Sequence, residues 1–235
     1  MGEINQPVFV LLDLDDTLLD FHKAEHIAIA KTFVHFGIAP EEPLIRRYSE
    51  INAEQWKRLE RGEIDREQVL VGRFALLFDE LGLDCSSREA KSTYENFLSQ
   101  GHYFIPGAEE LLEALRGKYR LFICSNGTAV VQEGRLKSAG IGPYFEEGFI
   151  SEEIGFNKPS AEFFERCFEK IPDFCRARTI MIGDSLTSDI LGGMNAGIRT
   201  CWFNPQGRPG RGDIVPDYEL GKLEQVPGLL EKLFC

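Results

Sequence analysis

The sequence predicts an α/β protein with a doubly wound, Rossmann-like parallel sheet and a helical domain inserted near its start. Two observations predict the sheet: five short apolar runs look like buried strands, and from residue 105 onward they alternate with stretches of helical periodicity. A third observation predicts the insertion, because residues 21–101 contain no strand-like run and look like four helices.

The expected strands follow one another along the chain at 8–12, 121–124, 148–150, 179–182 and 200–203. Helices are expected between them, one after Pro106-Gly107 and the others at about 128–139, 160–170 and 185–196. Gly140 and Gly197 are placed to end two of these helices. Because each strand returns to the sheet through a helix, the strands are expected to be parallel.

The insertion is clearest at residues 65–81, where apolar residues recur at helical spacing: Val69, Leu70, Phe74, Leu77, Phe78 and Leu81. We therefore expect two domains. The sheet domain comprises residues 1–20 and 102–235, and the inserted domain of four helices comprises residues 21–101.

The length of 235 residues suits one large domain or one domain with a smaller companion. The formal net charge of −12 disfavours a nucleic-acid polymer or an anionic membrane as a partner. It allows a small phosphorylated substrate, because a metal ion and a few local cations can override the overall field. No apolar run approaches the roughly 20 residues of a membrane span.

Cysteine usage and the first residues indicate a cytoplasmic protein. The six cysteines form no CxxC pair, and Cys124 and Cys201 lie in apolar runs, where we expect reduced thiols. The opening MGEINQPVF lacks the basic and apolar segments of a signal peptide. Gln6 also stands where a myristoylation signal has Ser or Thr.

Polar side chains follow three of the expected strands directly. Asp13 and Asp15 follow the first strand, Ser125 follows the second, and Asp184 and Asp189 follow the fourth. In an open parallel sheet, ligands bind outside the carboxyl ends of the strands. A single acid after a strand is more often a turn former or a helix N-cap. Three strands that deliver such residues together favour a functional site.

Several carboxylates directed at one place form a hard-oxygen site suited to Mg²⁺, which would also offset their mutual repulsion. Asp13 and Asp184 are the expected side-chain ligands. A carboxylate can also act as a nucleophile and form an aspartyl-phosphate. Asp15 could then protonate the leaving oxygen and later activate water.

Further residues are candidates for binding the phosphoryl group or supporting the site. The Ser125 hydroxyl and the amides of Asn126 and Gly127 could hold phosphoryl oxygens, and Thr17 could steady the loop through a side-chain hydrogen bond. Lys158, in GFNKPSAEFF, is the candidate cation for the charge of a transferring group. Asp16 is expected only to face solvent or to cap the turn.

The segments DLDDT, ICSN, NKP and GDSLTSD resemble, in order, the four signatures of the haloacid dehalogenase-like hydrolases, and the match spans nearly the whole chain. The resemblance implies that Asp13 is the nucleophile and Asp15 the general acid and base. It implies that Ser125 and Lys158 bind the phosphoryl group.

The same resemblance implies that Mg²⁺ is held by the Asp13 side chain, the Asp15 main-chain carbonyl and Asp184. Asp189 would be a further ligand, direct or through water, or would orient Lys158. The founding dehalogenases lack an aspartate at the position of Asp15, so its presence here indicates a phosphatase.

Four segments are similar to the pyrimidine 5′-nucleotidases of this superfamily: 56–64, 72–74, 150–159 and 183–205. This resemblance implies Mg²⁺-dependent hydrolysis of nucleoside 5′-monophosphates such as UMP, dUMP or dTMP. Alternatives are a sugar-phosphate or phosphoglycolate phosphatase, a phosphomutase, and a binding protein on an inactive hydrolase fold. A monomer or a homodimer is expected.

The inserted helices would form a cap that contributes substrate contacts. Phe21 and His22, near the hinge, are the expected contacts. Tyr48, Trp56, Arg58 and Arg73 are further candidates, although the spacing of eight between Tyr48 and Trp56 is more typical of packing between helices.

Overall fold

The computed structural model describes residues 6–234, which form two compact units. Within them, the core unit comprises residues 6–20, 104–129 and 140–234, and the helical unit comprises residues 21–103 and 130–139. The expectation about a signal peptide involves residues 1–5, and both these and Cys235 lie outside the described residues.

The core unit contains a six-stranded sheet in the order β3-β2-β1-β4-β5-β6, and every neighbouring pair is parallel. This confirms the predicted fold class. The five expected strands are present, and a short sixth strand was not predicted: β1 Phe9–Leu12, β2 Arg120–Ser125, β3 Glu147–Ile150, β4 Thr179–Gly183, β5 Arg199–Phe203 and β6 Tyr218–Leu220.

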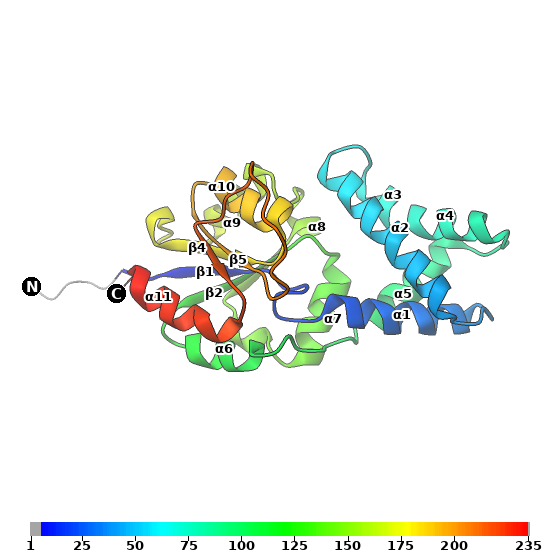
Figure 1. Cartoon of the computed structure of the whole chain (residues 1–235), viewed down its shortest axis with the longest axis horizontal. Helices are drawn as coiled ribbons and strands as arrows, with labels where there is room; N and C mark the ends of the chain where they lie inside the picture. The colour runs from blue at the N-terminus through cyan, green and yellow to red at the C-terminus, as the bar shows by residue number, and fades with distance from the viewer. Residues whose placement is uncertain (1–5, 235) are drawn as a thin grey trace, which may run out of the picture. The chain divides into compact units, whose positions relative to one another are not determined.

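Helices cover both faces of the sheet, with α9 and α10 on one face and α6 and α11 on the other (Figure 1). The bounds of the helices assigned wholly or partly to this unit are α6 Ala108–Leu115, α7 Ala129–Ala139, α8 Ser151–Ile154, α9 Ala161–Lys170, α10 Leu191–Asn195 and α11 Val226–Phe234. Four single turns join them: η1 Gly142–Tyr144, η2 Arg176–Arg178, η3 Leu186–Ile190 and η4 Leu223–Gln225.

The strand β1 lies in the middle of the sheet, and all four of its residues are fully buried. Phe9 and Leu11 pack in one apolar cluster with the aromatic face of α9, which includes Phe163 and Phe164. A strand buried on both faces has no alternation of apolar and polar residues, which is why β1 looks like a continuous apolar run in the sequence.

Residues 21–103 form five helices where four were expected: α1 Phe21–His35, α2 Glu42–Glu60, α3 Arg66–Leu70, α4 Gly72–Leu81 and α5 Ser87–Leu98. The predicted helix at 65–81 is divided at Val71 into α3 and α4. Asp65 caps α3 by accepting a hydrogen bond from the Gln68 main-chain amide, and the Gln68 side chain accepts one from the Asp65 amide in return.

Residues 130–139 of α7 group with the helical unit, whereas the sequence placed them in the sheet domain. Val131 joins the apolar cluster of the helical unit. A Cβ atom on Gly134 would clash with Ser99, so a glycine is needed where α7 approaches the end of α5. The buried Arg135 donates from Nε to the carbonyl oxygen of Gly101 at 3.0 Å.

Two of the further candidates for substrate contact, Tyr48 and Arg73, make contacts inside the helical unit. Tyr48 is fully buried against Phe74 and Tyr94, so it packs between helices as its spacing indicated. Arg73 is 3% exposed and donates from Nη1 to Asn52 Oδ1 at 2.8 Å.

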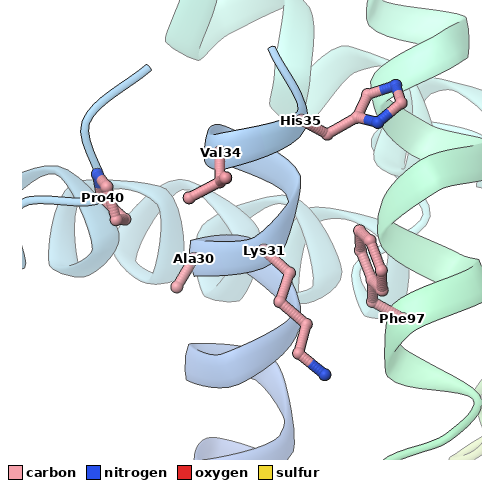
Figure 2. A pocket seen from close by; sticks show the side chains of 6 residues that line it. All are labelled: Ala30, Lys31, Val34, His35, Pro40 and Phe97. Carbon is pink, nitrogen blue, oxygen red and sulfur yellow. The ribbon is translucent and has the colours of Figure 1, made fainter. Parts of the chain in front are cut away.

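A hollow on the helical unit, about 410 Å³ in volume, has a mostly apolar lining. Figure 2 shows the side chains that line it: Ala30, Lys31, Val34, His35, Pro40 and Phe97. None of these residues was predicted to take part in chemistry.

Candidate active site

The register of the sheet brings three strand ends together. Leu12 at the end of β1 pairs with Ile123 in β2 and with Ile182 in β4. The Asp13 amide continues the ladder by donating to the carbonyl oxygen of Ile182 at 3.0 Å. Asp13, Ser125 and Asp184 therefore lie at one edge of the core unit, as their positions after the strands predicted.

Lys158 lies in the loop between α8 and α9, and its side chain reaches this edge. Its Nζ atom donates to Asp13 Oδ1 at 2.7 Å, to Asp189 Oδ1 at 2.6 Å and to the carbonyl oxygen of Cys124 at 2.6 Å. The lysine is 2% exposed. A buried ammonium with three acceptors is fixed in place, unlike a solvated surface lysine.

One ammonium group therefore serves two buried carboxylates. Burial raises the pKa of Asp13 to about 8, against the lowering effect of Lys158, and the charges of Asp189 and Asp15 raise it further. Burial by itself lowers the pKa of Lys158, but Asp13 and Asp189 raise it well above its usual range, so the lysine remains charged. The single positive charge of Lys158 does not balance the charges of Asp13 and Asp189 when both are ionised.

Asp184 adds a third carboxylate to this edge. Burial, followed by the charges of Asp13 and Asp16, raises the pKa of Asp184 to about 7, although Arg208 acts in the opposite direction. Carboxylate oxygens of Asp13, Asp184 and Asp189 lie within 4.8 Å of one another. The oxygen donors and the deficit of positive charge fit a hard divalent cation such as Mg²⁺.

Both oxygens of Asp189 accept hydrogen bonds from the protein. Oδ1 accepts from Lys158 Nζ, and Oδ2 accepts from the Ser185 amide at 3.0 Å. A Cβ atom on Gly183 would overlap the Asp189 carboxyl group, so the glycine at the end of β4 makes room for this contact. Of the two roles predicted for Asp189, these contacts favour orientation of Lys158.

The loop after β1 folds back beneath Asp13. Thr17 is fully buried and donates from Oγ1 to Asp13 Oδ2 at 3.4 Å, a long contact consistent with the loop-steadying role predicted for it. Asp16 has a φ of 57°, a left-handed conformation that aspartate tolerates, and its amide donates to the carbonyl oxygen of Leu19 at 2.8 Å. Asp15, which precedes Asp16, is partly exposed.

The loop after β2 supports Lys158. The Asn126 side chain accepts from the Lys158 amide through Oδ1 and donates from Nδ2 to the Lys158 carbonyl oxygen, both at 2.8 Å. Ser125 Oγ accepts from the Gly127 amide at 3.1 Å. The Asn126 side chain thus positions the lysine, while the predicted phosphoryl contacts involve the Ser125 hydroxyl and the main-chain amides.

Phe21 and His22 form the first turn of α1 and belong to the helical unit. Their predicted contact with substrate therefore stays a prediction. Among residues 6–234, no helix is both long and apolar enough to cross a membrane.

Three residues around Asp184 were not predicted. Trp202 Nε1 and Arg208 Nη2 both donate to the Asp184 carbonyl oxygen, at 2.8 Å and 2.9 Å, and Arg208 also bonds to the Asp184 carboxylate. Gly183 is the third, through its contact with Asp189. The segment 183–205 contains two of the three residues, but no spacing rule assigns them these contacts.

This fold and the site at its strand ends define a hydrolase class. Residues 9–197 match the family model described as haloacid dehalogenase-like hydrolase, so the chain belongs to that family and is an enzyme. Together with the full-length relatives described next, this membership confirms the predicted class of phosphoric monoester hydrolase.

Three relatives align over nearly their full length. The HAD-hydrolase YfnB of Bacillus subtilis is 39% identical over 94% of each chain, and the pyrimidine 5′-nucleotidase PynA of Streptococcus pneumoniae is 37% identical over 95% of each. The pyrimidine 5′-nucleotidase YjjG of Escherichia coli is 30% identical over 97% of each.

A crystal structure of YfnB bound to magnesium has a TM-score of 0.90 to this chain, with 96% of this chain and 99% of the other covered. The fold and the family are therefore shared over essentially the whole described chain.

Proposed function

We propose that the chain is a Mg²⁺-dependent phosphatase that hydrolyses nucleoside 5′-monophosphates, with the pyrimidine nucleotides UMP, dUMP and dTMP as substrates. The observation that carries this proposal is the position of Asp13, buried at the strand ends with one carboxylate oxygen 2.7 Å from Lys158 Nζ. The similarity to two pyrimidine 5′-nucleotidases over nearly the full length supports the substrate class.

In the first step, an Asp13 carboxylate oxygen attacks phosphorus and the bond between phosphorus and the ester oxygen breaks. The two electrons of that bond leave with the nucleoside oxygen, which takes a proton from the Asp15 carboxyl group. Asp13 then carries the phosphoryl group as a mixed anhydride. Lys158 stabilises the charge on the phosphoryl oxygens, and Ser125 donates a hydrogen bond to one of them.

In the second step, the Asp15 carboxylate takes a proton from a water molecule as its oxygen attacks phosphorus. The bond between phosphorus and the Asp13 oxygen breaks, which releases inorganic phosphate and restores the Asp13 carboxylate. Asp15 thus ends with the proton that it needs for the next cycle.

Asp13, Asp184 and the main-chain carbonyl of Asp15 would hold Mg²⁺, which supplies positive charge to the substrate and to the carboxylates. Asp189 supports the site by holding Lys158. Thr17 supports it through Asp13, and Asn126 through the main chain of Lys158.

The test is a phosphate-release screen of the purified protein over nucleoside monophosphates and sugar phosphates, each with Mg²⁺ and with EDTA. We expect turnover of UMP, dUMP or dTMP with Mg²⁺ and none with EDTA. Turnover of sugar phosphates or phosphoglycolate, with none of nucleotides, would contradict the substrate class alone. Failure to hydrolyse any phosphate ester would contradict the proposed reaction.

A further inference from the structure

The loop after β5 places an arginine against a proposed metal ligand. Arg208 Nη2 donates to Asp184 Oδ2 at 3.2 Å and to the Asp184 carbonyl oxygen at 2.9 Å. The carbonyl is also held by Trp202 Nε1, so the main chain of Asp184 has two donors from this part of the fold. Arg208 thus contacts both the main chain and the carboxyl group of Asp184.

The position of Arg208 is itself built by a buried side chain. Asn204 is 3% exposed, accepts from the Arg208 amide through Oδ1 and donates from Nδ2 to the Arg208 carbonyl oxygen, both at 2.9 Å. Its Nδ2 also donates to Glu219 Oε1 at 2.7 Å, which ties the loop to β6. The guanidinium group lies 5.9 Å from the centre of the Trp202 ring.

We propose that Arg208 is a positioning residue that fixes the Asp184 carboxyl group for a divalent cation, with Asn204 as the brace that holds Arg208 in place. The inference rests on the proposed function, because it takes Asp184 as a metal ligand. It assigns to the segment 204–208 a role in metal affinity, which neither Arg208 nor Asn204 was expected to have from the sequence.

The hydrogen bond to Oδ2 restricts rotation of the carboxyl group about its Cβ–Cγ bond. A ligand that is already oriented loses less freedom on binding a cation, and loss of such an outer contact typically weakens metal binding about 10- to 100-fold.

The positive charge of Arg208 acts in the opposite direction by repelling a cation. The Arg208 side chain is 46% exposed, however, so water screens its charge, whereas the orienting effect of the hydrogen bond does not depend on long-range attraction. The orienting effect is therefore expected to be the larger.

The experiment is calorimetric titration of the metal-free, full-length protein with MgCl₂ alone, which reads metal affinity independently of turnover. Arg208→Met keeps a long apolar stem and removes the guanidinium group. Arg211→Met is the matched control, because Arg211 belongs to the same loop but bonds to the exposed Asp213. Thermal unfolding in EDTA verifies that each variant is folded.

We expect the dissociation constant for Mg²⁺ to rise about tenfold in Arg208→Met and to stay within twofold of wild type in Arg211→Met. Asn204→Ala should also weaken Mg²⁺ binding, because Arg208 loses its brace. Arg208→Lys should recover part of the affinity, since an ammonium group can still donate to the carboxylate.

Mg²⁺ binding by Arg208→Met that is equal to or tighter than wild type would overturn the positioning role and leave the proposed function standing. Absence of Mg²⁺ binding by the wild type would instead contradict the metal site of the proposed function, and this inference with it. Should Arg208→Met be unfolded, the same comparison is made with Arg208→Gln.

Discussion

Asp13→Asn is expected to lower kcat for nucleotide hydrolysis by about 10⁴-fold or more, while the protein stays folded. An amide has the shape of the carboxyl group but cannot attack phosphorus. The variant also replaces a buried carboxyl group, whose pKa burial raises to about 8, with a neutral group that can still accept a hydrogen bond from Lys158. Phosphate release from UMP with Mg²⁺ measures kcat, and thermal unfolding in EDTA reports the fold.

The matched control is Asp16→Asn, which removes a carboxylate from the same loop. Asn tolerates the left-handed backbone of residue 16, where φ is 57°. We expect kcat of this variant to stay within about fivefold of wild type, because Asp16 is partly exposed and water weakens the effect of its charge. Ordinary turnover by purified Asp13→Asn would refute its role as nucleophile.

Lys158→Met is expected to lower kcat about 100- to 1000-fold, the range found when one preorganised donor to a developing charge is removed. It should also destabilise the metal-free protein by about 3–5 kcal/mol, because Asp13 and Asp189 lose the buried partner that they share. Steady-state kinetics with saturating Mg²⁺ gives the first effect, and denaturant unfolding in EDTA gives the second.

Lys118→Met is the control for Lys158→Met, since Lys118 is an exposed lysine of the core unit. It should change neither kcat nor the free energy of unfolding appreciably. A value of kcat for Lys158→Met within a few-fold of wild type would show that the buried ammonium does not stabilise the transferring group.

The sheet and the residues at its edge were predictable from one sequence pattern. The short apolar runs indicate the buried strands, and the polar residues that follow them indicate the site. The run before Asp13 is buried on both faces, and in parallel strands the residues after each run lie at the same edge. This rule predicted from the sequence alone that Asp13, Ser125 and Asp184 lie close together. Lys158 was placed near them by its order in the chain.

Some elements were not predicted because their sequences lack a clear helical or strand pattern. The helix α11 contains Pro227 and Gly228 in its first turn, and such a pair indicates a turn when it is seen in isolation. β6 has only three residues, and none of them is fully buried, so it has no apolar run. The break at Val71 leaves the helical periodicity of its neighbours intact.

The supporting contacts of the site could not be predicted, because they join side chains to main-chain atoms of irregular loops. Asn126 holds the main chain of Lys158 across 32 positions, and Asn204 holds the main chain of Arg208 across only four. Neither asparagine interrupts a pattern of apolar residues. The Asn126 contact depends on which loops the sheet brings together, and the Asn204 contact depends on how one loop folds on itself. Periodicity contains neither kind of information.

In the proposed mechanism, Asp13 carries the phosphoryl group during turnover. The most direct measurement uses Asp15→Asn with p-nitrophenyl phosphate and Mg²⁺, because p-nitrophenolate leaves without needing a proton, whereas attack by water still needs a base. The reaction is quenched in acid, and the peptides are analysed by mass spectrometry. The double variant Asp13→Asn/Asp15→Asn is the control.

We predict one phosphoryl group per chain on Asp13 of Asp15→Asn, and none on the double variant. An Asp15→Asn protein without a phosphoryl group on Asp13, from a wild type that hydrolyses the same ester, would contradict the aspartyl-phosphate mechanism.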